Sequence, residues 1–99
     1  MKPFADSLRE MRRITLLRSL SEQPGYFANS SILLTQLLFL GVASSHDDVV
    51  TDLHWLKDQG LVDLTEPAPG VTVATLRRRG QEVASGAVSV PGVKRPSAR

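Results

Sequence analysis

The chain has 99 residues, 41% of them hydrophobic, and contains no cysteine. This length suits one small domain with a modest core. Without cysteine the chain can form no disulfide, thiol nucleophile or thiolate metal site, which fits a reducing cytoplasm. Its most apolar run covers residues 32–40, far shorter than the about 20 residues that a membrane span needs. We therefore expect a cytoplasmic protein without a membrane segment.

The formal net charge of +2 is unevenly distributed along the chain. Residues 1–43 carry five bases and three acids (+2), residues 44–66 one base and six acids (−5), and residues 67–99 six bases and one acid (+5). Fields act over about a Debye length, near 8 Å at physiological salt, so this local polarity matters more than the total.

Residues 3–22 are predicted to form a long amphipathic helix. Pro3 suits its first turn. Apolar side chains recur at helical spacing, at Phe4, Leu8, Met11, Ile14 and Leu17. The arginines fall on the other faces, among them Arg12 and Arg13. They are interpreted either as a solvated basic surface or as phosphate contacts.

A turn and a second, more apolar helix follow. A Pro-Gly turn at residues 23–25 ends the first helix, and residues 26–28 can form a short extended segment. Polar residues at 29–31 offer N-caps for a helix over residues 31–40. This helix is apolar on more than one face, so it is buried either in the domain's own core or against a dimer or protein partner. Its predicted partner contacts are Leu33, Phe39 and Leu40.

The stretch from residue 44 to residue 64 is predicted to be a capped amphipathic helix that runs into a strand. Ser45 is a good N-cap, and Asp48 three residues later makes an acidic variant of the capping box. Gly60 can take the left-handed conformation that ends a helix. At about 100° per residue, one face collects Val49, Val50, Leu53 and Leu56.

Two strand-like runs, residues 61–66 and 71–76, flank a Pro/Gly loop and predict a β-hairpin. Thr75 is a candidate cap for a short fourth helix, in which Gly80 is a soft point. From residue 87 the chain has two prolines, small residues and terminal bases, so we expect a tail that is ordered only against a partner. The predicted division is a domain of residues 1–86 and a Pro-rich, basic tail of residues 87–99.

The order helix, short strand, helix, turn, helix and hairpin resembles the winged-helix superfamily. More narrowly, three segments resemble a family of small proteins encoded in Mu-like phages and prophages: LLFLGVASSHDDVVTDLHWLKDQGLV, ATLRRRGQEVASG and VPGVKRP. The resemblance implies a fold that is mainly α with a small β-hairpin (α+β), a winged helix-turn-helix with three helices, a wing and a short C-terminal helix. It also implies a phage context, and hence the cytoplasm of a bacterial host cell.

In helix-turn-helix proteins the second helix of the motif enters the DNA major groove, and here that is the third helix of the chain. Its predicted exposed side carries Asp47, Asp48, Thr51, His54, Trp55 and Asp58. Three of these six residues are acidic and none is Arg or Lys, whereas DNA affinity is dominated by the neutralisation of phosphates. The wing loop has no base either. This charge chemistry favours an interaction module over a protein that reads DNA.

The bases that can contact phosphates lie elsewhere. The residues predicted to bind DNA are Arg12, Arg13, Thr51, His54, Lys57, Arg77, Arg78 and Arg79. The last three arginines are alternatively solvated or paired with the acidic helix. Trp55 either packs on the wing or the first helix, or joins the predicted partner contacts as an anchor.

No catalytic site, metal site or cofactor is predicted. His46 and His54 are too far apart on one helix to share a metal, and His54 with Asp58 would supply only two ligands. A phosphate-binding glycine loop is absent from the sequence. Two functions remain open. One is a non-catalytic phage DNA-binding protein with a regulatory or DNA-handling role, ranked first on the fold, and the other is a dimeric adaptor or protein-interaction module that does not read DNA.

Overall fold

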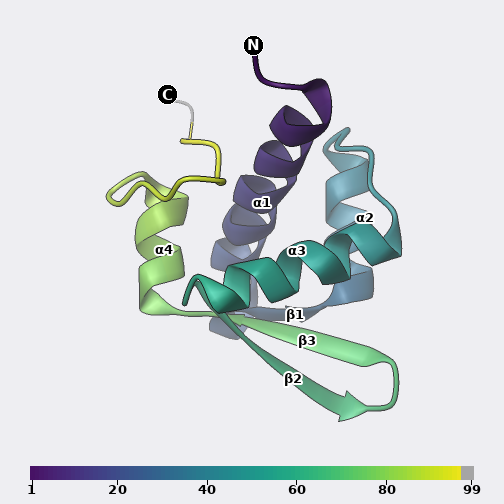
Figure 1. The fold of residues 1–99 in the computed structure, drawn as a ribbon. Coiled ribbons are helices and arrows are strands. Elements are labelled where there is room, and N and C mark those ends of the chain that lie inside the picture. Colours follow the sequence, from purple (N-terminus) through teal and green to yellow (C-terminus); the bar gives the residue numbers. More distant parts are fainter. Residues whose placement is uncertain (97–99) are drawn as a thin grey trace.

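Within residues 1–96, which the computed structural model describes, the chain folds into four α-helices and a three-stranded sheet (Figure 1). The elements are α1 (Phe4–Glu22), β1 (Phe27–Asn29), α2 (Ser30–Phe39), α3 (His46–Asp58), β2 (Val62–Ala68), β3 (Val71–Leu76) and α4 (Arg78–Ser85). A 3-10 turn at Pro24–Tyr26 joins α1 to β1. This is the predicted α+β winged-helix arrangement, with three helices, a wing formed by β2 and β3, and a short fourth helix.

The segment after α1 is a strand of the sheet. β1 pairs antiparallel with β3, which also pairs antiparallel with β2, so the strand order is β1-β3-β2. Ala74 in β3 is fully buried and lies opposite Ala28 on one side and Leu64 on the other. The predicted extended segment therefore ties the connection between α1 and α2 to the base of the wing. The far end of the hairpin projects away from the helices (Figure 1).

Both ends of α3 are fixed by the residues that the sequence predicted. The Asp48 backbone N–H donates to the Ser45 hydroxyl oxygen (3.0 Å), and the Ser45 N–H donates to the Asp48 carboxylate (2.9 Å), which completes the capping box. At the other end, Gly60 has a φ of +76°. On the predicted apolar face, three side chains are fully buried in the core: Val49, Leu53 and Leu56.

α2 contributes to the same core. It begins at Ser30 because the Ile32 N–H donates to the side-chain oxygen of Asn29 (2.8 Å). Leu33 and Leu37 are fully buried in one cluster with residues of α1 and α3. The prediction that Leu33 contacts a partner is therefore wrong, because the domain itself encloses this side chain. No helix within residues 1–96 has the length and apolar character that crossing a membrane requires.

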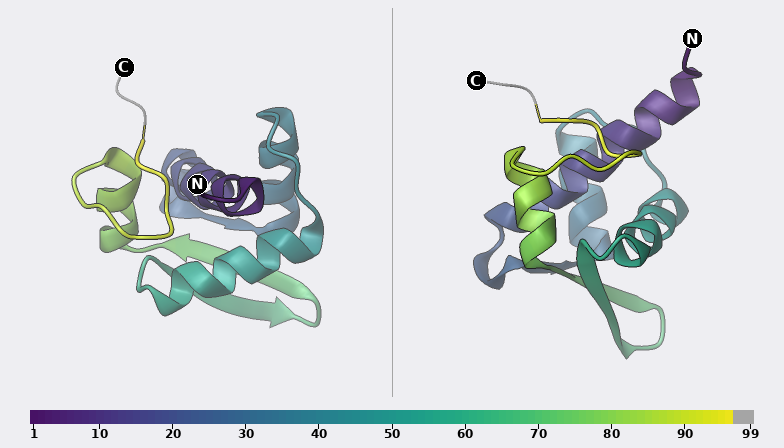
Figure 2. Two further views of the ribbon diagram at one scale, coloured as in Figure 1. Left: turned by 45° about the horizontal axis from the view of Figure 1, so that its top comes forward. Right: turned by 60° about the vertical axis from the view of Figure 1, so that its left-hand side comes forward.

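The chain after α4 is part of the domain rather than a separate tail. Val90 and Val93 are buried in the core that α1 and α3 also form. The Lys94 N–H donates to the Glu10 carbonyl oxygen (3.3 Å), which holds this segment alongside α1 (Figure 2). The predicted domain boundary at residue 86 is therefore wrong, because residues 87–96 pack on the domain. Residues 97–99 of the predicted tail lie outside the described residues.

α4 differs from its prediction at its start and at Gly80. Thr75 does not cap it, because this residue lies within β3, and Arg77 takes the N-cap position without a side-chain cap. A Cβ on Gly80 would overlap the Leu61 carbonyl oxygen and lie 2.6 Å from Leu76 Cδ1. Gly80 is thus no soft point in the helix but the place where α4 touches the chain that leads into β2.

Gly80→Ala is expected to destabilise the fold by about 1–3 kcal/mol, the range for overpacking a close contact. The added methyl group has to displace the backbone of Leu61, which cannot rotate away as a side chain would. Urea unfolding followed by circular dichroism measures the change. The control is Gln81→Ala, exposed on the same helix, which is expected to change stability by less than about 0.5 kcal/mol. Equal stability of Gly80→Ala and the wild type would contradict the close contact.

Candidate nucleic-acid interface

The exposed face of α3 carries more acid than base. Asp47, Thr51, His54 and Asp58 recur at spacings of three and four residues, and all four are exposed. Lys57, in the last turn, is exposed as well. Two carboxylates against one ammonium make this face unfavourable to phosphate. The same helix nevertheless exposes three of the residues predicted to bind DNA: Thr51, His54 and Lys57.

Three consecutive exposed arginines, Arg77, Arg78 and Arg79, form a concentrated basic surface that we call the arginine patch. The Arg77 backbone N–H donates to the Leu61 carbonyl oxygen (3.0 Å), which fixes the start of α4. The Arg77 Nε lies 4.0 Å from an Asp63 carboxylate oxygen, but both side chains are more than half exposed, so this pair contributes little. The first backbone N–H groups of α4 have no acceptor within the helix, and the helix dipole there favours anions.

The arginine patch lies at the C-terminal end of α3. An open hollow of about 470 Å³ is lined by the patch together with Gln59, Gly60 and Glu82. Lys57 lies two residues before Gln59, in the last turn of α3. The arginine patch and Lys57 therefore lie together at one end of α3 and at the base of the wing, whereas Asp47 lies in the first turn at the other end (Figure 1).

The prediction that Arg12 and Arg13 contact phosphates is wrong, because both side chains point inward and are only 7% and 9% exposed. Arg12 Nη1 lies 3.0 Å from one carboxylate oxygen of Asp52, and Arg13 Nε lies 3.0 Å from the other. Arg12 also donates to the Ser44 hydroxyl (2.8 Å) and to the Ala43 carbonyl oxygen (3.3 Å). The donors of these arginines are used inside the protein and are not available to DNA.

Asp52 is the residue that reasoning from the sequence missed. It is fully buried, and its two oxygens accept hydrogen bonds from the two guanidinium groups. A signal was present, because Asp52 follows Val49 by three residues and precedes Leu56 by four, which places it on the buried face of α3. A carboxylate on such a face needs a cationic partner, and α1 supplies two.

Trp55 packs against α1 and the C-terminal segment. The Arg13 guanidinium carbon lies 3.8 Å from the centroid of the indole ring, which is a cation–π contact. Arg13 Nη1 donates to the Gly92 carbonyl oxygen (3.0 Å), and a Cβ on Gly92 would come within 2.7 Å of the indole. Trp55 is half-buried in this stack, which supports the packing alternative over the partner anchor.

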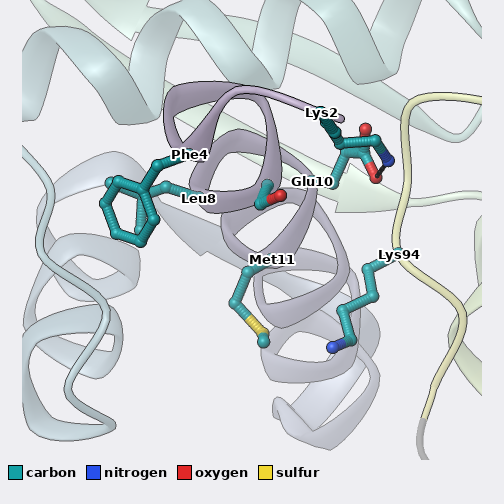
Figure 3. A pocket seen from close by; sticks show the side chains of 7 residues that line it. Lys2, Phe4, Leu8, Glu10, Met11 and Lys94 are labelled. Atoms are coloured by element: carbon teal, nitrogen blue, oxygen red, sulfur yellow. Dashed lines mark hydrogen bonds and ion pairs between the residues drawn. The ribbon is translucent and has the colours of Figure 1, made fainter.

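The remaining predicted partner contacts, Phe39 and Leu40, are exposed at the end of α2. A separate hollow of about 370 Å³ lies on the outer face of α1 (Figure 3). Phe4 and Met11 give it an apolar wall, and Lys94 of the C-terminal segment borders it. This hollow suits apolar contact, and it shares no lining residue with the arginine patch.

The chain is similar in sequence to a phage protein. Over 94 residues it is 45% identical to the uncharacterized protein gp26 of Escherichia phage Mu, and the match covers 95% of this chain and 96% of gp26. The chain belongs to the family of phage Mu gp26. An uncharacterized protein of Haemophilus influenzae is 38% identical over 76 residues, which are 77% of this chain and 74% of that protein. The predicted relationship to a Mu phage protein is confirmed, while no family model matches the chain.

Among solved structures, the complex structure of hsRosR-S1 aligns with this chain at a TM-score of 0.62. The alignment covers 74% of this chain and 63% of the hsRosR-S1 chain, so this chain spans less than two-thirds of that protein. The sequences are 18% identical, and the likeness therefore concerns the fold alone. It supports a winged-helix-like architecture.

Asp52→Ala is expected to destabilise the fold by about 3–5 kcal/mol, because it leaves Arg12 and Arg13 buried without a counter-charge. Chemical denaturation at neutral pH measures the change. The control is Asp58→Ala, which removes an exposed carboxylate from the same helix and is expected to stay within about 0.5 kcal/mol of the wild type. Similar stabilities of the two variants would show that the fold does not need the buried carboxylate.

Asp48 connects the cap of α3 to Arg12. Hydrogen bonds from the backbone and the side chain of Ser45 hold the pKa of the Asp48 carboxyl below its ordinary value of 3.8. The positive charge of Arg12, whose Nη2 lies 3.6 Å from the carboxylate, acts in the same direction. Because the pKa is lowered in the folded state, the stabilising contribution is present above about pH 4 and is lost as the pH falls through the lowered pKa.

Asp48→Asn is therefore expected to flatten the dependence of stability on pH below about pH 4. Between about pH 6 and pH 3 the wild type should lose more free energy of unfolding than this variant, as measured by urea denaturation at each pH. Asp47→Asn is the matched control, because Asp47 lies in the same turn but outside the capping box. This control should keep the pH dependence of the wild type. If Asp48→Asn kept it as well, the loss of stability at low pH would not come from the Asp48 carboxylate.

Proposed function

We propose that this protein is a non-catalytic DNA-binding protein of phage or prophage origin, with a regulatory or DNA-handling role. The observation that carries the proposal is the arginine patch at the C-terminal end of α3 in a winged-helix-like fold. Three exposed guanidinium groups and the N-terminus of α4 provide N–H groups that can donate hydrogen bonds to phosphate oxygens. Membership of the family of a phage Mu protein supports the phage context.

In this proposal, different groups contact the phosphates and the bases. The arginine patch and Lys57 neutralise phosphates, which positions the protein on the duplex without reading its sequence. Thr51 and His54, on the exposed face of α3, reach the base edges. Asp47 and Asp58 on the same face repel the DNA backbone, although an aspartate can accept a hydrogen bond from a cytosine amino group. We therefore expect weak binding that depends strongly on salt.

Replacing all three arginines of the patch by glutamine is expected to weaken binding to duplexes of every sequence. The slope of log affinity against log salt should become shallower by about 1 for each phosphate that the variant no longer neutralises. Fluorescence anisotropy with labelled duplexes, titrated from low to physiological salt, measures both quantities. The matched control is Arg9→Gln, because Arg9 is an exposed arginine that pairs with Asp6 on α1, outside the patch. This control should bind as the wild type does.

Thr51→Ala and His54→Ala are expected instead to change the preference among duplex sequences, because these side chains are assigned to base edges. Their salt slopes should remain close to that of the wild type. Competition between duplexes of different sequence measures the preference. Failure of the wild type to bind any duplex at low salt would overturn the proposal, and so would binding that neither set of variants changes.

A second candidate is a protein-interaction module or dimeric adaptor that does not read DNA. The acidic exposed face of α3 and the exposed Phe39 and Leu40 of α2 favour it. The low-salt titration separates the two candidates, because only the first requires binding to duplex DNA.

A further inference from the structure

The outer face of α2 is largely apolar. Ser31, Ile32, Thr35, Leu38 and Phe39 recur at helical spacing, and all five are exposed. We call these residues the α2 face. No residue of α2, which is described over its whole length, is charged. The Thr35 hydroxyl donates to the Ser31 carbonyl oxygen (3.0 Å), so its hydrogen-bonding need is met within the helix.

Within residues 1–96 the α2 face remains uncovered. α2 stands at the edge of the molecule, and its other sides pack on α1, α3 and the sheet (Figures 1 and 2). Ile32, Leu38 and Phe39 are 46%, 54% and 88% exposed, and the following Leu40 is 56% exposed. Single exposed apolar residues are ordinary on a protein surface. Four large ones on one helix and its cap are typical of a contact site.

We propose that the α2 face is the surface through which two copies of this protein associate about a two-fold axis. In a two-fold interface the same patch meets itself, so a charged group near the axis meets the same charge on the other copy. The α2 face is free of charge and avoids this repulsion. The acidic face of α3 and the arginine patch would each repel their own copy. This proposal stands whether or not the protein binds DNA.

The available area fits a weak dimer. An exposed aromatic side chain contributes about 150–250 Å², so Phe39 with the half-exposed Ile32 and Leu38 offers roughly 300 Å² of apolar surface per copy. Standard interfaces bury about 800 Å² per partner, and weak ones bury less than about 600 Å². We therefore expect weak association that reverses on dilution.

Thr35 marks the centre of the α2 face. It lies between Ser31 and Ile32 at one end and Leu38 and Phe39 at the other. A two-fold axis through this centre brings the two Thr35 side chains together whether the helices run parallel or antiparallel. The small side chains at positions 31 and 35 also let the two helices approach closely.

Analytical ultracentrifugation over a dilution series tests the association without any DNA. The wild type should shift from dimer to monomer, and Phe39→Ser should weaken the association at least about tenfold, because it truncates the largest apolar side chain of the α2 face. Phe4→Ser is the matched control, because Phe4 is 80% exposed on α1 and lies outside the α2 face. A wild type that stays monomeric at its highest concentration would overturn the proposal. So would loss of the dimer in Phe4→Ser but not in Phe39→Ser.

Cross-linking gives a second test, because the chain has no cysteine of its own. Thr35→Cys is expected to form a disulfide-linked dimer on mild oxidation, since the proposed axis brings the two thiols within reach of each other. Ser7→Cys, exposed on α1, is the control and should cross-link only at the slower rate of random encounters. Equal rates for the two variants would contradict the proposed surface. Adding Phe39→Ser to Thr35→Cys should slow the cross-linking, and an unchanged rate would contradict it as well.

Discussion

The buried contact between Asp52 and the two arginines of α1 determines how α3 is placed. Removing a carboxylate from water costs several kcal/mol, and only a well-formed set of opposite charges and hydrogen bonds offsets that penalty. Here each oxygen of Asp52 faces one guanidinium group at 3.0 Å, and Arg12 is held further by Ser44 and Ala43. Because a guanidinium group is planar and its donors point in fixed directions, the contact restricts the rotation of α3 about its own axis. That rotation decides which side chains of α3 face the solvent.

Arg13 extends the same contact to the segment after α4. Its guanidinium group lies against Asp52, stacks on Trp55 and donates to the Gly92 carbonyl oxygen. One side chain thus joins α1, α3 and the segment after α4, which is also held by the buried Val90 and Val93 and by the Lys94–Glu10 hydrogen bond. The buried positive charge of α1 consequently holds the fold together, whereas the exposed positive charge includes the arginine patch, Lys57, Lys94 and Arg95.

The sequence was informative where the determining interactions are local. The Ser45 cap, the glycine after α3 and the hairpin depend on neighbours within a few residues, so their signals are readable along the chain. Three arginines in a row are also readable, because they can hardly all be buried. The burial of Arg12, Arg13 and Leu33 depends on how many elements surround a helix, which periodicity does not report. The ordering of residues 87–96 rests on contacts with residues about 80 positions earlier, such as Arg13 with Gly92.

The two proposed surfaces have complementary weaknesses. In the proposed DNA complex, one arginine patch with Lys57 would neutralise few phosphates, so a single copy would gain little affinity for DNA. Two copies joined through the α2 face would carry two arginine patches, and binding of the first patch would raise the effective concentration of the second. Linkage then requires that a duplex bridging both patches strengthens the dimer by the same factor by which dimerisation strengthens DNA binding. If both proposals hold, an α2 face of modest area would suffice, because a bridging duplex would add to the association free energy of the protein interface.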